Sequence, residues 1–202
     1  ACVPLYSALA RAGYYSIDRL MEYGEINSDF MHHISSKVPG VEFSTGSLGH
    51  GLPFALGKAI QLKHSLGSAA PTVFVLLGDG ELAEGSNWEA LLIAAHHKIN
   101  NLKIILDNNN LQSFKSVDET LSLGNIRLKV ESFGFEYVEI DGHDHFCLYE
   151  TLKYKSVKPM FINCKTIKGK GVSFMENEVR WHYANPNDEE LERALKEILD
   201  EK

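Results

Sequence analysis

The order of apolar and polar positions along the chain predicts strands that alternate with helices. Apolar runs predict strands over residues 72–77, 102–107, 136–140 and 160–164, the first being continuous enough to suggest a fully buried parallel strand. Helical spacing and capping residues predict helices over 3–12, 16–23, 52–66, 86–99, 128–133, 145–155 and 188–199, with residues 24–49 mostly loop. We expect Gly134 to end one helix and Asp144 to begin the next.

This alternation predicts an α/β fold, a parallel central sheet with helices on both faces. A chain of 202 residues is long enough for one such domain with a substantial core. We therefore interpret residues 1–202 as a single domain.

Composition excludes some partners and leaves others open. A net charge of −7 without a long basic run argues against a nucleic-acid backbone as the main partner. Phosphate ligands stay possible, since they need only local donors. The sequence has no apolar stretch long enough to span a membrane and no recognisable signal peptide, and its three scattered cysteines suit a reducing cytosol. We therefore expect a cytoplasmic protein that binds neither nucleic acid nor membrane.

Two polar motifs follow two successive predicted strands. Gly78-Asp79-Gly80 follows the first, and Asn109 follows the second. Ligands of open α/β sheets bind beyond the carboxyl ends of the strands, where an Asp and an Asn offer the hard oxygen ligands that suit Mg²⁺ or Ca²⁺. Either motif alone is better interpreted as a turn. Together they predict a site for one metal ion and the diphosphate it carries, as in thiamine diphosphate binding.

Several further motifs occur in the order typical of one enzyme family. They are the segments 75–90 and 43–51, Asp-Gly-His-Asp at 141–144, Lys-Thr-Ile-Lys-Gly-Lys-Gly at 165–171, and the stretch from Trp181 to Glu190. In these motifs the chain resembles transketolases along essentially its whole length. It is most similar to the N-terminal subunit of split transketolases, which carries the diphosphate-binding domain. Relative to that pattern it lacks several dozen N-terminal residues.

The resemblance implies thiamine diphosphate as the cofactor, with Mg²⁺ as its metal and Ca²⁺ or Mn²⁺ as alternatives. The implied metal ligands are the side chains of Asp79 and Asn109 and the carbonyl of Leu111. The implied cofactor-binding residues include both metal side chains and a further set near the diphosphate and the aminopyrimidine: Gly46, Ser47, Leu48, Gly78, Gly80 and Glu81. His50 departs from the family pattern, which has Gln at this position.

The resemblance also implies four catalytic residues. His32 and His182 match histidines that contact the sugar and assist proton transfer, work for which a pKa near neutrality is suited. Glu84 and Glu89 match an acidic pair that joins two active sites across a dimer. Simpler interpretations exist for three of them: a solvent-exposed histidine for His32, and helix-surface acids for the glutamates. We expect His143 to shape a strand-to-helix turn.

The implied reaction is transfer of a two-carbon ketol unit from a ketose phosphate to an aldose phosphate. The pyrimidine-binding domain is absent from the chain, so the resemblance implies a pyrimidine-domain partner subunit, an assembly of two copies of each, and sugar phosphates as substrates. Alternatives are another thiamine diphosphate enzyme, such as deoxyxylulose-phosphate synthase or a 2-oxo acid dehydrogenase subunit, and a non-catalytic subunit that binds cofactor or stabilises a partner.

Overall fold

The structure is a computed structural model and describes residues 2–200. These residues form two compact units, one ending at Gly51 and the other beginning at Leu52. Each unit is described separately below.

The first unit is a small helical cluster followed by a long loop. Helix α1 (Cys2–Arg11) and the 3-10 helix η1 (Ile17–Glu22) confirm the two predicted helices, and Ser16 accepts a hydrogen bond from the Asp18 amide as the predicted cap. Tyr6 and Phe30 are fully buried and meet edge to face, with ring centroids 5.3 Å apart. This aromatic contact fastens the loop to α1.

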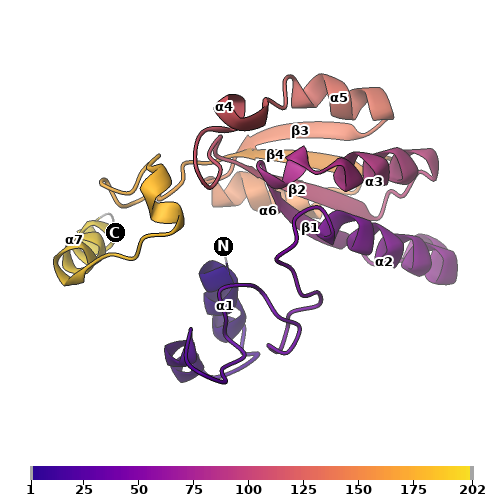
Figure 1. The fold of residues 1–202 in the computed structure, drawn as a ribbon. Coiled ribbons are helices and arrows are strands. Elements are labelled where there is room, and N and C mark those ends of the chain that lie inside the picture. Colours follow the sequence, from indigo (N-terminus) through magenta and orange to yellow (C-terminus); the bar gives the residue numbers. More distant parts are fainter. Residues whose placement is uncertain (1, 201–202) are drawn as a thin grey trace. The chain divides into compact units, whose positions relative to one another are not determined.

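The second unit contains the sheet and most helices (Figure 1). Its strands are β1 (Val73–Gly78), β2 (Leu102–Asn108), β3 (Glu136–Asp141) and β4 (Met160–Lys165). Its helices are α2 (Gly51–Leu66), which begins at the unit boundary, α3 (Gly85–His96), α4 (Val117–Leu121), α5 (Ile126–Phe133), α6 (His145–Lys153) and α7 (Asp188–Asp200), with 3-10 turns η2 (Gly67–Ala69), η3 (Glu81–Ala83) and η4 (Val179–His182). Gly134 in a left-handed conformation ends α5, and Asp144 caps α6, as predicted.

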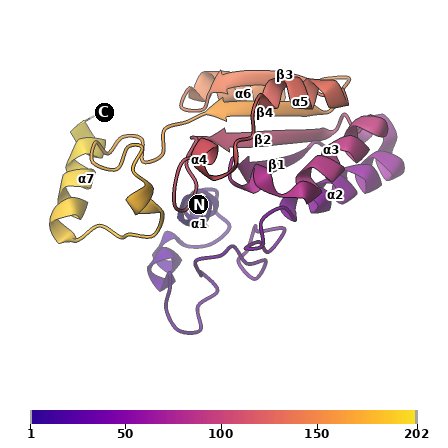
Figure 2. The same cartoon turned by 45° about the horizontal axis from the view of Figure 1, so that its top comes forward.

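All strand pairs are parallel, in the order β1-β2-β4-β3. The chain moves one way across the sheet through α3 and α5 and returns from β3 to β4 through α6. Right-handed crossovers place helices on opposite faces when the direction reverses, so α6 covers the face opposite to α5 (Figure 1). In Figure 2, α2 and α3 run side by side against the α5 face. The predicted parallel sheet with helices on both faces is confirmed.

Side chains alternate between the two cores along each strand. Ile104, Leu106 and Phe161 face the core shared with α2, α3 and α5, whereas Ile105 and Ile162 face the core under α6.

Strand β1 differs from prediction. It lies at the edge of the sheet, and Phe74 and Leu76 are 51% and 65% exposed. An apolar run does not distinguish an edge strand from a central one, so the prediction of a fully buried strand is wrong for this face of β1.

Buried polar groups at the amino-terminal end of the sheet are satisfied by the chain itself. Lys103 is 3% exposed, and its ammonium group donates to carbonyls of Thr151, Leu152 and Tyr154 at the end of α6. Ser156 donates to Glu136 across the same end of the sheet. These contacts close the carboxyl terminus of α6, where helix carbonyls lack partners within the helix.

The segment after β2 contains structure that hydrophobic periodicity does not predict. A single antiparallel bridge joins Leu111 to Ser116, so residues 111–116 form a short hairpin. Helix α4 then begins with a capping box in which Ser116 and Glu119 satisfy each other's backbone amides. Within residues 2–200, no helix has the length and apolar character needed to cross a membrane.

Candidate functional site

The carboxyl ends of β1 and β2 meet at one edge of the sheet, with Gly78 beside Asp107. Asp79 follows β1 directly and is 3% exposed. One of its carboxylate oxygens accepts the Gly80 amide at 2.8 Å, and the other accepts the Asn110 amide at 2.5 Å. Asp79 therefore joins the two predicted motifs, which lie 31 residues apart in sequence at this contact.

The carboxylate of Asp79 is held in an unfavourable place for a negative charge. Burial raises its pKa above the ordinary value of 3.8, and the neighbouring charge of Asp107 adds to the rise. The backbone amides of Asn110 and Gly80 oppose it. Among residues 2–200, no cationic side chain forms an ion pair with Asp79. A bound cation would stabilise the ionised carboxylate.

Asn109 and Leu111 lie in a tight turn beside Asp79. The Asn109 side-chain oxygen accepts the Leu111 amide at 3.0 Å, and Asn110 adopts a left-handed conformation with φ of 60°. The bonds on either side of the Leu111–Ser116 bridge use the Asn110 carbonyl and the Gln112 amide. No amide in the described part of the chain donates to the Leu111 carbonyl. The structure thus brings together the three predicted metal ligands, with that carbonyl available.

The glycines of the first motif differ in their surroundings. A methyl group at Gly78 would meet nothing within 4 Å, whereas one at Gly80 would lie 3.1 Å from Cγ of Gln112. The side-chain nitrogen of Gln112 is itself buried and has no hydrogen-bond acceptor among the described residues. A buried donor without a partner is costly, so its presence beside Gly80 suggests that a ligand supplies the acceptor. The sequence analysis missed Gln112, because only the hairpin geometry places it there.

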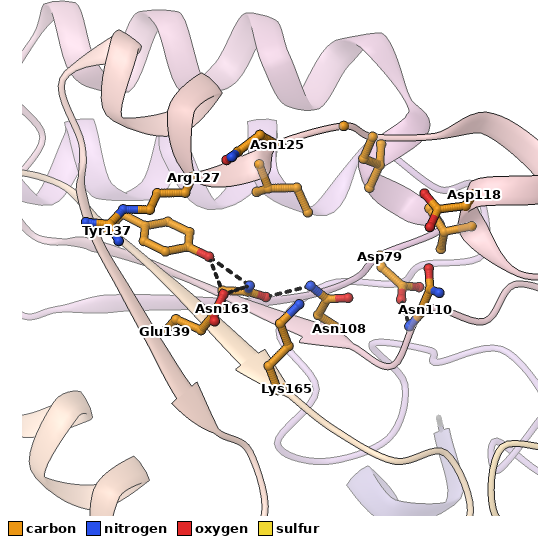
Figure 3. Close-up of a pocket in the computed structure, with 14 residues that line it drawn as sticks. Asp79, Asn108, Asn110, Asp118, Asn125, Arg127, Tyr137, Glu139, Asn163 and Lys165 are labelled. Carbon is orange, nitrogen blue, oxygen red and sulfur yellow. Dashed lines mark hydrogen bonds between the residues drawn. The ribbon is translucent and has the colours of Figure 1, made fainter.

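A cavity of about 510 Å³ extends from Asp79 along the carboxyl ends of β2, β4 and β3. Figure 3 shows Asp79 and Asn110 at one end and Tyr137 and Arg127 at the other. Between them, Asn108 and Asn163 are joined by a hydrogen bond of 2.9 Å. The cavity is therefore walled by polar side chains, and its far end lies well beyond the predicted metal ligands.

Glu81, Glu84 and Glu89 follow the glycine motif. Glu81 begins η3, and Glu84 stands between η3 and α3, where its side chain makes no capping bond. Glu84 is exposed and Glu89 is at least partly exposed in this chain. Their positions agree equally with surface acids and with acids that meet a second subunit.

His182 ends η4, on a loop stabilised by aromatic contacts. Its ring packs against Tyr183, with centroids 4.7 Å apart, and Tyr183 in turn packs against Phe114 of the hairpin at 6.2 Å. Partial burial lowers the pKa of His182, and the nearby ammonium group of Lys168 lowers it further. These contacts place the His182 loop next to the hairpin that follows Asn109.

His143 has the structural role expected of it. Its ring nitrogen accepts the Ile167 amide at 2.8 Å, so that it ties the turn after β3 to the segment after β4. A side chain at neighbouring Gly142 would collide with Thr166.

The remaining candidates belong to the first unit. His32 is exposed and packs against Tyr23, with ring centroids 5.2 Å apart. The Tyr6 hydroxyl donates to the carbonyls of Met31 and His33, which fixes the backbone on both sides of His32. Gly46, Ser47 and Leu48 are exposed, and Gly46 lies against the His33 ring.

Comparison with known protein families gives a match over residues 1–200 to the thiamine diphosphate binding domain of transketolase. The chain belongs to the transketolase family. This agrees with the motif pattern and with the parallel sheet. The transketolase from Campylobacter jejuni is similar in structure, with a TM-score of 0.90 and 33% identity over 96% of this chain and 32% of its own. The chain thus spans about a third of that single-chain transketolase.

Separate subunits are also among the relatives of this transketolase-family chain. One of the two subunits of an apulose-4-phosphate transketolase from Actinobacillus succinogenes is 43% identical to it, over 97% of this chain and 71% of the relative. The protein of the same name from Phocaeicola vulgatus is 36% identical over 96% of this chain and 69% of the relative. The resemblance to the N-terminal subunit of a split transketolase is therefore confirmed.

Proposed function

We propose that this chain is the diphosphate-binding subunit of a split transketolase, which transfers a two-carbon ketol unit between sugar phosphates with thiamine diphosphate and Mg²⁺. The observation that carries the proposal is the convergence of Asp79, the Asn109 turn and an unpaired Gln112 donor at one sheet edge. The family match to a thiamine diphosphate binding domain supports it.

The donor set fits a metal-bound diphosphate. The Asp79 carboxylate, the Asn109 side-chain oxygen and the Leu111 carbonyl would hold Mg²⁺, which prefers oxygen ligands, while diphosphate oxygens and water complete its shell. Mn²⁺ and Ca²⁺ accept the same ligands. The open space at Gly78 and the Gln112 amide would receive the diphosphate.

When bound, thiamine diphosphate supplies the carbon nucleophile of the ketol transfer, and the protein orients it. His182 would hold or move a proton at its imidazole nitrogen. Since burial lowers its pKa, the ring is neutral at pH 7 and able to accept a proton from a sugar hydroxyl. His32, with its backbone fixed by Tyr6, would contact the sugar.

The chain contains only the diphosphate-binding domain, so the proposal includes a pyrimidine-domain partner in a heterotetramer. Glu84 and Glu89 would meet the equivalent acids of a second copy. Coupled carboxylates of this kind would titrate as a set. The names of the two apulose-4-phosphate transketolase relatives suggest apulose 4-phosphate as the first donor substrate to test, followed by other ketose phosphates.

The test is a reconstitution. The chain is purified with thiamine diphosphate and Mg²⁺, co-purifying polypeptides are identified by mass spectrometry, and the complex is assayed for ketol transfer. We expect a pyrimidine-domain subunit, turnover by the complex, and negligible turnover by the chain alone. The same complex is then given pyruvate with glyceraldehyde phosphate.

Ketol transfer by the purified 202-residue chain alone would contradict the need for a partner. Turnover only with pyruvate would indicate a deoxyxylulose-phosphate synthase. A complex that binds the cofactor and turns over neither substrate pair would indicate a non-catalytic subunit.

A further inference from the structure

A buried asparagine in β4 stands behind the candidate metal site. Asn163 is 2% exposed, although its neighbours Phe161 and Ile162 are apolar core residues. Its oxygen accepts the Asn108 amide at 2.9 Å, and its nitrogen donates to the Tyr137 hydroxyl and to Glu139, both at 2.8 Å. The amide oxygen and the amide nitrogen are thus both satisfied within the chain.

These partners fix the orientation of the Asn163 amide. If the amide were flipped, its nitrogen would face the Asn108 nitrogen and its oxygen would face the Glu139 carboxylate, so donors would meet donors and acceptors would meet acceptors. Tyr137 also donates to Glu139 at 2.8 Å. Burial and this bond raise the pKa of Tyr137 to about 12, while the same bond lowers the pKa of Glu139. The phenol stays protonated and the carboxylate ionised at neutral pH.

The network reaches the candidate site through one residue. Asn108 is the last residue of β2 and directly precedes Asn109 (Figure 3). The same strand end is held by Thr166, whose amide donates to the Asn108 carbonyl at 3.2 Å and whose hydroxyl bonds to Asp107. The Asn108 side chain itself is fixed by its hydrogen bond to Asn163. A loss of that contact would free the start of the turn that carries Asn109 and Leu111.

We propose that Asn163 is a positioning residue, which acts through Asn108 to hold the Asn109 turn in register with Asp79 for binding of the metal-bound diphosphate. This inference rests on the proposed function. Asn163 touches neither metal nor cofactor, and its effect passes through the backbone of β2. Partners behind metal ligands typically change metal affinity about 10- to 100-fold when they are removed.

The test compares three variants of the chain. Asn163→Leu keeps the volume and removes the network, and Tyr137→Phe removes one bond to Asn163. Ser156→Ala is the matched control, since it removes a buried hydrogen bond to the same strand, β3, at the opposite end of the sheet. Thermal unfolding gives the stability of each variant.

Two readouts separate positioning from a general loss of stability. The first is amide hydrogen exchange at Asn110 and Leu111 in the ligand-free chain. The second is the affinity for Mn²⁺ in the presence of thiamine diphosphate, measured by electron paramagnetic resonance. For Asn163→Leu we expect exchange about tenfold faster and Mn²⁺ affinity about tenfold weaker, with smaller changes in the same direction for Tyr137→Phe. Ser156→Ala should change neither readout, even where it lowers stability equally.

The outcomes are distinct. Unchanged exchange and affinity in both network variants, or equal changes in Ser156→Ala, would overturn the inference and leave the proposed function intact. Failure of the unaltered chain to bind Mn²⁺ with thiamine diphosphate would overturn the metal site itself. If Asn163→Leu fails to fold, Tyr137→Phe decides the question by the same two readouts.

Discussion

The two ends of the sheet treat buried polar groups in opposite ways. At the amino-terminal end, Lys103 is almost fully buried and donates to three carbonyls of α6 and the residue after it. At the carboxyl-terminal end, Asp79 is equally buried, yet its pKa is raised, and the Gln112 amide nearby lacks an acceptor among the described residues. Burial alone therefore does not identify a functional group. A buried polar group that the chain leaves unsatisfied is the better guide, since its desolvation cost is not offset within the chain.

The largest expected effect breaks the carboxyl-terminal end. Asp79→Asn should weaken Mn²⁺ binding in the presence of thiamine diphosphate by about 100-fold or more, roughly 2.7 kcal/mol, because the only charged ligand in the proposed metal site is lost. Isothermal titration calorimetry measures this. Asp118→Asn is the control, since Asp118 is an exposed acid on the wall of the same cavity. Equal losses in both variants would contradict a specific role for Asp79.

The same variant sharpens the pH dependence. The folded-state pKa of Asp79 is raised, so the folded chain binds its proton more tightly than the unfolded chain does. Its contribution is thus most favourable below the ordinary value of 3.8 and is lost as pH rises through the folded-state pKa. The free energy of unfolding of the unaltered chain should fall relative to that of Asp79→Asn as pH increases over this window. Parallel pH profiles from chemical denaturation would contradict it.

The next effect breaks the amino-terminal end. Lys103→Met should lower the free energy of unfolding by about 2 kcal/mol, because three carbonyls at the end of α6 lose a charged donor. Mn²⁺ affinity should stay within about twofold, since the change is at the opposite end of the sheet. Urea denaturation and the same calorimetry check both statements. Lys155→Met, at an exposed lysine just after α6, should leave stability unchanged.

A smaller effect should have opposite signs in two measurements. Gln112→Met removes a buried donor that has no acceptor among the described residues, so the ligand-free chain should gain about 1 kcal/mol of stability. Binding of thiamine diphosphate with Mg²⁺ should weaken about fivefold, because the ligand loses that donor. Gln61→Met, where the amide already bonds to Ser65, serves as control. A stability gain without a binding loss would exclude Gln112 from the site.

The smallest effect concerns His182. Lys168→Met removes a positive charge that lowers the pKa of this histidine, so the pKa should rise toward its ordinary value of 6.5. Titration of the ring proton signals by nuclear magnetic resonance gives the answer. Lys170→Met is the matched control, because the Lys170 ammonium lies 3.6 Å from Glu176. An equal rise in both variants would indicate a general charge effect.

Most of the fold was predictable, because each strand and long helix has its own period of apolar residues and its own end signals. Helix α4 was missed, since five residues are too few to show a period, although the Ser116 and Glu119 pair of its capping box is visible in the sequence. The exposed face of β1 was also missed, because a strand's place in the sheet depends on strands elsewhere in the chain.

The candidate site divides in the same way. The meeting of Asp79 with the Asn109 turn followed from two motifs at the ends of successive strands. Asn163 could not be identified, because its partners lie 24, 26 and 55 residues away and only the pairing of β4 with both β2 and β3 brings them together. The catalytic roles of His32 and His182 stay predictions.

The open edge of β1 has a practical consequence for anyone who handles this chain. Its free side presents unpaired backbone groups next to Phe74 and Leu76, both exposed, and the segment from Val73 to Leu77 carries no charge. Uncharged, apolar edge strands favour self-association between identical molecules. Concentrated stocks of the purified chain should therefore form oligomers over time, and a lysine introduced at Leu76 is the simplest way to extend their shelf life.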